Sequence, residues 1–351
     1  MLTTEQLDKI QKQMYETLPV YQETDSYNFK YSKFAEDTDM QIENNRWTWQ
    51  EINLEKDKHD FLQRMTEKEK YATIFALKLF LKYEVMVGGD YWSGRFRKMF
   101  KRPEFKRKAS FYAHQEENVH APFYNEFNKV MGLTTDEFYE SYKQSPILVE
   151  RIKFISSMLK NNFDLYSLGA FTFIEGAVLY NNFAWFKHFQ VGGKNLIANA
   201  VAGTDQSVLD EDNHAHYSAE CFRILINEGS EYGIITDDIK KEIYQNIQEI
   251  GRKVEEHEYE IIKAMFPYGE CEEYTIEQAI GFTRRRINEC LMRMDIDPIF
   301  KIENDTVFQW FKSTTSLYSA NDNFHKKSRE YKSPGNNLKI YSVDVSQDIL
   351  R

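Results

Sequence analysis

Two Glu-x-x-His segments are the most informative chemical pattern in the sequence. They are Glu117-Asn-Val-His120 and Glu211-Asp-Asn-His214. On an α-helix, residues three apart lie on the same face, so each segment can direct a carboxylate and an imidazole at one metal ion. Because the chain has 8 histidines, one such spacing can arise by chance, and the two segments need support from other residues.

That support comes from a carboxylate inside an apolar helical stretch before each segment. Glu84 lies in LFLKYEVMV and Glu175 lies in FTFIEGAVLYNNF. A lone buried glutamate costs several kcal/mol to desolvate unless it is paired, protonated or bound to a metal. The separations from Glu84 to Glu117 and from Glu175 to Glu211, 33 and 36 residues, let the chain finish one helix, turn and return to the same depth.

Two such carboxylate-plus-Glu-x-x-His pairs are typical of a dinuclear carboxylate site in a ferritin-like four-helix bundle. Four carboxylates and two imidazoles form an oxygen-rich ligand set that favours iron or manganese over zinc. The opposing interpretation is a network of buried ion pairs without metal. His114, three residues before Glu117, is a competing candidate for the place of His120.

Long helices are predicted around these residues. Thr66 and Glu69 form a capping box that starts a helix of about six turns, and Gly88 and Gly89 disturb or end it. Further helical stretches are predicted over 104–131, 148–188, 194–225, 237–265 and 276–294. Because no long stretch alternates as a strand does, we expect an all-α fold with a four-helix-bundle core and additional helices.

Composition agrees with a helical protein and excludes several classes. Among 351 residues, Gly (15) and Pro (7) are few, which argues against β-barrels and sandwiches. Three cysteines, Cys221, Cys271 and Cys290, have no CxxC spacing, from which we expect neither a disulfide scaffold nor a thiolate zinc site. The net charge of −10 argues against nucleic acid as a partner. Without a long apolar run or a signal peptide, we expect a cytoplasmic protein with no membrane contact.

Four segments together resemble the small, radical-generating subunit of class I ribonucleotide reductase. They are HQEENVHAPFY, SVLDEDNHAHYS, the tryptophan-led WTWQEINLEKD and the late GFTRRRINECLMRMDIDPIF. The resemblance spans roughly 47–311. It departs from the family in two respects: both carboxylate separations are slightly long, and Ser207 stands where an aliphatic residue is usual.

The resemblance implies a metal centre and a radical. By this resemblance, the protein would bind two iron ions, with Mn/Mn or Mn/Fe as alternatives, and would use O2 for activation. The implied metal ligands are Glu84, Glu117, His120, Glu175, Glu211 and His214. Tyr124, four residues after His120, would carry the radical, and Leu179 and Phe183 would shield it from water.

The resemblance also implies a path for the radical. Trp47, Asp210 and His120 would form a hydrogen-bonded relay, with Asp210 fixing the imidazole tautomer. In the C-terminal tail, residues 326–351, Tyr331 would pass the radical to the large subunit, where ribonucleotides are reduced. Tyr341 is the other candidate for this role. His216 and Asp212 are expected to point away from the metal face, and Arg284–Arg286 to form an exposed basic face.

Three parts of the chain are expected. Residues 1–45 form an N-terminal arm, 46–325 form the di-metal domain, and 326–351 form a flexible C-terminal tail that binds the large subunit. A homodimer is expected from the resemblance and from the prevalence of two-fold assemblies.

Three other functions fit part of the pattern: a di-metal oxidase or oxygenase with its own small substrate, a ferritin-like iron store, and a purely structural helical protein. An oxygenase needs neither Tyr124, nor Trp47 with Asp210, nor the tail. An iron store needs a much shorter chain. A structural protein leaves four buried carboxylates unexplained.

Overall fold

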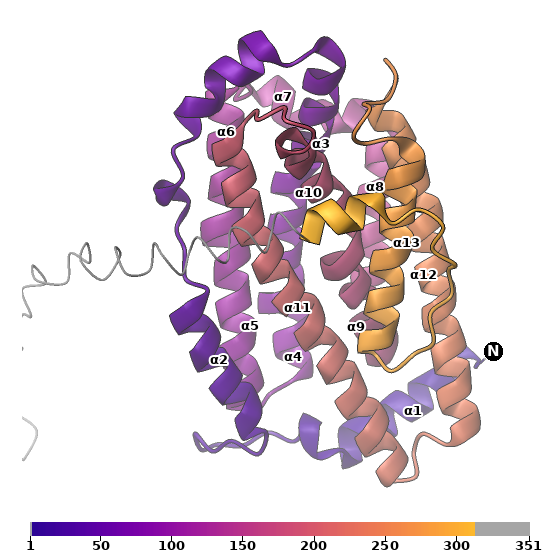
Figure 1. Cartoon of the computed structure of the whole chain (residues 1–351). Coiled ribbons are helices and arrows are strands. Elements are labelled where there is room, and N and C mark those ends of the chain that lie inside the picture. Colours follow the sequence, from indigo (N-terminus) through magenta and orange to yellow (C-terminus); the bar gives the residue numbers. More distant parts are fainter. Residues whose placement is uncertain (1, 313–351) are drawn as a thin grey trace, which may run out of the picture. The chain divides into compact units, whose positions relative to one another are not determined.

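The computed structural model describes residues 2–312, and these residues form a helical protein (Figure 1). Within this range no β-strand occurs, and the one isolated bridge joins Cys271 and Tyr274. The all-α prediction is confirmed. The described residues up to Phe311 belong to one compact unit, and the expected domain boundary at residue 325 lies outside the described residues. No helix among the described residues is long and apolar enough to cross a membrane.

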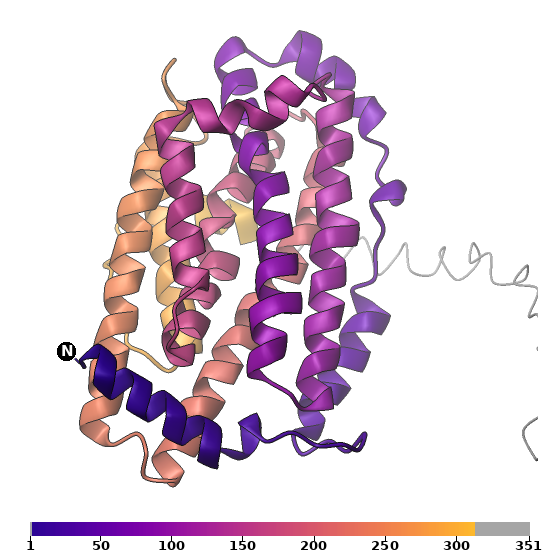
Figure 2. The same ribbon diagram turned by 180° about the vertical axis from the view of Figure 1, so that it is seen from behind.

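Four long helical segments form the core of the unit (Figures 1 and 2). Three of them contain π-helical turns, in which the backbone hydrogen bond spans one residue more than in an α-helix. The segments are α3 (Glu67–Val85) with η5 (Met86–Phe96) and α4 (Arg97–Met99); α5 (Pro103–Gln115) with η6 (Glu116–His120) and α6 (Ala121–Val130); α9 (Asp164–Phe173) with η8 (Ile174–Val178) and α10 (Tyr180–Lys187); and α11 (Ala198–Glu231).

Additional helices cover this core. They are α7 (Asp136–Glu140), α8 (Pro146–Leu159), α12 (Asp237–Met265), α13 (Ile276–Arg293) and a last helical segment over 306–312. The capping box of Thr66 and Glu69 starts α3 as predicted. Gly88 and Gly89 disturb this helix, as predicted, because they lie in the π-helical segment η5, which continues it. One expectation changes: the single region expected over 148–188 is two helices, α8 and α9–α10.

The N-terminal arm contains two helices, α1 (Thr4–Thr17) and α2 (Ser32–Asn44). The hydroxyls of Tyr15 and Tyr21 donate to the buried carboxylate of Asp164 at 2.7 and 2.9 Å. Gln11 donates to the same carboxylate at 3.1 Å. Three donors from the arm therefore attach it to the start of α9, and the arm belongs to the same compact unit as the bundle.

Candidate metal centre

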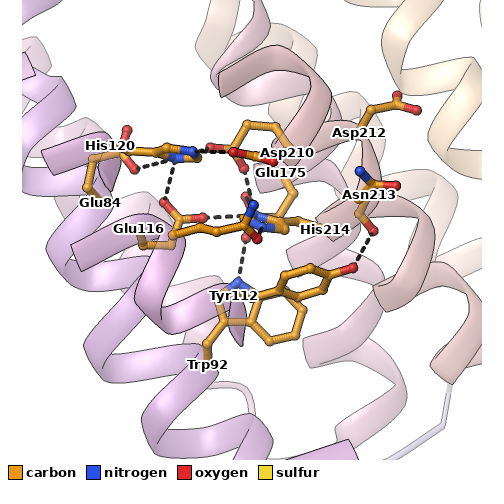
Figure 3. A network of polar contacts seen from close by, with 12 residues as sticks. Glu84, Trp92, Tyr112, Glu116, His120, Glu175, Asp210, Asp212, Asn213 and His214 are labelled. Atoms are coloured by element: carbon orange, nitrogen blue, oxygen red, sulfur yellow. Dashed lines mark hydrogen bonds and ion pairs between the residues drawn. The ribbon is translucent and has the colours of Figure 1, made fainter. Parts of the chain in front are cut away.

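Six ionisable side chains meet at the centre of the bundle, where all are buried (Figure 3). Each of the four core segments contributes at least one. They are Glu84 from α3, Glu116 and His120 from η6, Glu175 from η8, and Glu211 and His214 from α11.

The six side chains form two groups that share two carboxylates. Glu116 and Glu211 belong to both groups, whereas Glu84 belongs only to the group of His120, and Glu175 only to that of His214. Within each group the candidate ligand atoms lie within 4.8 Å of one another. We call Glu116 and Glu211 the bridging carboxylates and Glu84 and Glu175 the terminal carboxylates. Two ligand groups that share two carboxylates could hold a pair of metal ions.

In the first group, Nδ1 of His120 faces three carboxylates. It lies 3.4 Å from Oε2 of Glu84, 3.3 Å from Oε2 of Glu116 and 3.2 Å from Oε1 of Glu211. The opposite nitrogen, Nε2, lies 3.0 Å from Oδ2 of Asp210. One side of the ring therefore faces the metal position and the other is held by a carboxylate.

The second group has the same plan. Nδ1 of His214 lies 2.8 Å from Oε1 of Glu116, 3.0 Å from Oε2 of Glu211 and 3.8 Å from Oε2 of Glu175. Its Nε2 lies 3.2 Å from the amide oxygen of Gln115. Each bridging carboxylate thus directs one oxygen at each histidine.

The structure corrects one predicted ligand: Glu117 is exposed, and Glu116 occupies the expected position. The cause is the π turn of η6, which brings the residue four before His120, rather than three, onto the inner face. Gly88 of η5 lies against this turn. A Cβ at Gly88 would be 2.9 Å from Cβ of Glu116 and 2.8 Å from Cγ of Glu117, so glycine permits the close approach of the two π segments.

The residues fit a pair of divalent cations. Six of the candidate ligand atoms are buried and lack a hydrogen-bond partner within the described part of the chain. They are both oxygens of Glu84, Oε1 of Glu116, Oε1 of Glu211, Oε2 of Glu175 and Nδ1 of His120. Unpartnered buried acceptors are costly. Four ionised carboxylates carry a charge of −4, which two divalent cations balance.

Without cations, protons balance the charge. Burial, and then the neighbouring bridging carboxylate, raise the pKa of both terminal carboxylates well above the ordinary value. Burial would lower the pKa of His120 and His214, but the adjacent carboxylates outweigh it and raise both well above 6.5. Against burial, contact with Glu84 and then the nearby histidines lower the pKa of Glu116. The histidines lower the pKa of Glu211 against burial and the charge of Glu116.

Trp47 and Asp210 lie where the sequence predicted them to meet His120. Nε1 of Trp47 donates to Oδ2 of Asp210 at 2.8 Å, the same oxygen that contacts His120. The Trp47 and His120 rings are 5.9 Å apart. Since a carboxylate only accepts, Asp210 fixes the protonated Nε2 and leaves Nδ1 for a metal.

Tyr124 is fully buried next to the first group. Its ring stacks on Phe80 at 4.0 Å, and Phe80 in turn packs against Phe183 at 5.6 Å. The phenol has no hydrogen-bond partner among residues 2–312. Burial, and then the charge of Glu84, raise its pKa well above 10, whereas nearby Ser207 has the opposite, smaller effect. The phenol therefore lies against aromatic rings in the interior of the protein, with the buried Ser207 as a polar neighbour.

Three residues around the second group were not predicted. Gln115 contacts His214, Nε1 of Trp92 donates to Oε1 of Glu175 at 3.1 Å, and the Tyr112 ring lies 4.1 Å from the His214 ring (Figure 3). Tryptophan, glutamine and tyrosine on a helix face are ordinary packing residues, so the sequence held no signal for these roles.

Arg286 is the second correction. Instead of an exposed basic face, it is buried, and its Nε donates to the carbonyl of Gly176 at 2.8 Å. Gly176 lies in the π turn η8, next to Glu175. Because a π turn disturbs the regular helical hydrogen bonds, Arg286 gives a carbonyl of this turn an additional donor. Its guanidinium also covers the Tyr180 ring at 3.7 Å.

Other expectations at the site agree with the structure. His114, the competing candidate, is exposed, as is His216. Asp212 points away from the cluster toward Arg286 and Arg293. Tyr331 and Tyr341 lie outside the described residues.

Comparisons with known proteins identify the family. The profile of the family described as "Ribonucleotide reductase, small chain" matches residues 24–306. A probable ribonucleoside-diphosphate reductase small subunit of Invertebrate iridescent virus 3 is 24% identical over 309 residues, which cover 82% of this chain and 79% of the viral one.

Solved structures share the fold. The ribonucleotide reductase R2 subunit from Clostridium botulinum is 22% identical, with a TM-score of 0.68 over 82% of this chain and 89% of that chain. A dimanganese(II)-NrdF from Streptococcus sanguinis is 19% identical, with a TM-score of 0.67 over 82% and 97% of the two chains. With a ferritin-like fold and a profile match over most of its length, the chain belongs to the family of ribonucleotide reductase small chains.

Proposed function

We propose that the chain is the radical-generating subunit of a ribonucleoside-diphosphate reductase, and that it forms a tyrosyl radical at Tyr124. The observation that carries this proposal is the presence of two groups of candidate metal ligands, which share two carboxylates, near a fully buried phenol without a hydrogen-bond partner in the described range. When bound, the metal pair would supply the oxidising power, drawn from O2, that removes one electron and one proton from Tyr124.

The protein itself would hold the two metal ions and keep water away from Tyr124. The bridging and terminal carboxylates with His120 and His214 would hold the two ions. The ring of Phe80 covers the phenol, Phe183 packs against Phe80, and we propose that the buried Leu179 adds to this apolar wall. Such a wall would keep water and reductants away from an oxidised tyrosine.

The contacts among Trp47, Asp210 and His120 support a relay. These side chains connect the first metal position with the segment 45–57, which precedes the bundle. We propose that an electron passes along this chain, with Asp210 holding the His120 proton in place, and that the tail, through Tyr331, carries the oxidation to the large subunit. Ribonucleotide reduction would occur there.

The proposed assembly is a homodimer that binds the large subunit through its tail. A related fold supports the dimer: the Rnr4 protein of Saccharomyces cerevisiae, 18% identical with a TM-score of 0.70, was solved as a homodimer. The metal is iron or manganese, since both accept this ligand set, and the solved dimanganese relative makes manganese a specific alternative.

Electron paramagnetic resonance tests the proposal. The metal-free chain is loaded anaerobically with Fe(II) and exposed to air; we expect a tyrosyl radical coupled to a metal pair. Tyr124→Phe should bind the same amount of metal and give no such signal. Tyr180→Phe, a buried tyrosine on α10 that contacts Arg286, is the matched control and should keep it. An unchanged signal in Tyr124→Phe would refute the assignment. Two bound ions without a radical would favour manganese or a di-metal oxidase.

A further inference from the structure

A second cluster of metal-binding residues lies outside the dinuclear centre. Ligand atoms of Glu69, His188 and Cys271 lie within 4.8 Å of one another, and all three residues are buried. They come from the first turn of α3, from the turn that follows α10, and from the segment before α13. Nothing in the proposed radical chemistry requires them.

His188 has the orientation of a metal ligand. Its Nδ1 contacts the backbone carbonyl of Trp185, and because a carbonyl only accepts, Nδ1 must carry the proton. Nε2 is then the lone-pair nitrogen. It is fully buried and has no hydrogen-bond partner among the described residues. A backbone carbonyl that fixes the far nitrogen is the usual support of a metal-bound histidine.

Two carboxylates share one ammonium beside the cluster. The ammonium of Lys194 lies 2.7 Å from Oε1 of Glu69 and 3.1 Å from Oε2 of Glu273, so one positive charge serves two carboxylates. Lys194 is 21% exposed, so it can move toward Glu273 and leave Oε1 of Glu69 free. A divalent cation bound by one carboxylate and one thiolate would then neutralise the cluster.

We propose that Glu69, His188 and Cys271 bind a zinc ion that joins the start of α3, the end of α10 and the segment leading into α13. One thiolate, one imidazole and one carboxylate are zinc ligands, whereas the oxygen-rich dinuclear centre favours iron or manganese. Binding releases the Cys271 proton to solvent and forms Zn–S, Zn–N and Zn–O bonds without oxidation or reduction. The fourth position is left to a solvent molecule.

The first test uses Co2+ as the probe on the metal-free full-length chain. A thiolate ligand gives cobalt a charge-transfer absorption band that carboxylates and imidazoles do not give, so the dinuclear centre cannot mimic it. We expect the band to reach one equivalent, and excess Zn2+ to remove it. A wild-type chain that shows no thiolate–cobalt band overturns the proposal, whatever happens at the dinuclear centre.

Variants assign the band to this cluster. Cys271→Ser should abolish it, whereas Cys290→Ser, a buried control whose Sγ lies 3.4 Å from the Thr172 carbonyl, should retain it. A band that persists in Cys271→Ser overturns the proposal. Lys194→Met keeps all three ligands and removes the competing ammonium, so cobalt affinity should rise about tenfold. An unchanged or weaker affinity would contradict the proposed competition even where Cys271→Ser fails to fold.

Discussion

The two Glu–His pairs of the metal centre do the same task with different backbones. Glu211 and His214 are three residues apart on the regular helix α11, whereas Glu116 and His120 are four apart on the π turn η6. Both glutamates nevertheless bridge the two histidines at distances of 2.8–3.3 Å. The spacing that places a glutamate and a histidine on the same face therefore depends on the local helix geometry. It is three residues on the α-helix α11 and four residues on the π turn η6.

The surroundings of the two histidines differ as well. Nε2 of His120 faces the charged Asp210, which is bonded to Trp47, whereas Nε2 of His214 faces the neutral amide of Gln115. A carboxylate makes its histidine a more basic ligand and favours charge movement through it. This difference supports the proposal that the first half passes electrons to the relay while the second half mainly holds a metal.

The largest expected effect tests the π turn directly. Glu116→Gln should weaken binding of the metal pair at least about 100-fold, because it removes a bridging carboxylate whose loss should exceed that of an outer partner. Glu117→Gln, one residue away and exposed, should bind two ions normally. Metal content after dialysis against a weak chelator measures both. The reverse outcome would return Glu117 to the ligand set.

A second pair of variants separates the histidines' partners. Asp210→Asn should lower turnover with the large subunit about 10- to 100-fold, because Asp210 both orients His120 and connects it with Trp47. Gln115→Ala should weaken metal binding slightly and leave radical transfer intact. Turnover is compared with radical content per chain. Equal effects of the two variants would remove the proposed division between the halves.

Metal affinity should rise with pH in both halves. The pKa values of His120, His214 and the terminal carboxylates are raised in the metal-free chain, so these groups hold protons that the cations must displace. Affinity should increase about tenfold per pH unit for each proton released.

The same shifts set a stability trend. Groups with raised pKa stabilise the metal-free fold fully below their unfolded values, near 6.5 for histidine, and lose this contribution as pH rises through the folded values. Denaturation of the metal-free chain should therefore become easier as the pH rises above about 6.5, whereas the loaded chain should resist it. A metal affinity that does not change with pH would contradict the prediction that the cations displace protons from these groups.

The smallest expected effect is on packing. A Cβ at Gly176 would collide with Sγ of Cys290 and come within 3.1 Å of Cβ of Ala215. Gly176→Ala should therefore lower the free energy of unfolding by about 1–3 kcal/mol. Adding Cys290→Ala should recover part of the loss, because it removes the principal clash. Chemical denaturation of the single and double variants measures this coupling, and additive losses would exclude the contact.

Much of the site could be predicted because burial of charge is visible in a sequence. Glu84 and Glu175 stand in apolar helical stretches, where an unpartnered carboxylate is too costly to keep. The pair Glu211 and His214 lies on a regular helix, for which the three-residue rule holds. The start of α3 at Thr66 was predictable because a capping box is a local pattern.

Tertiary structure decided what depends on contacts between helices. Apolar periodicity is nearly the same for an α turn and a single π turn, so it does not distinguish Glu116 from Glu117; in the packed structure the π turn η6 lies against Gly88 of η5 and Glu116 joins the cluster. Likewise, Arg286 is buried because the π turn η8 presents the carbonyl of Gly176 to it. The sequence by itself determined the helical bundle and the chemistry of its buried carboxylates, since both follow from local periodicity and desolvation. Only the packed structure decided which neighbouring carboxylate faces inward, because one residue of helical register costs little locally and is selected by the opposing helix.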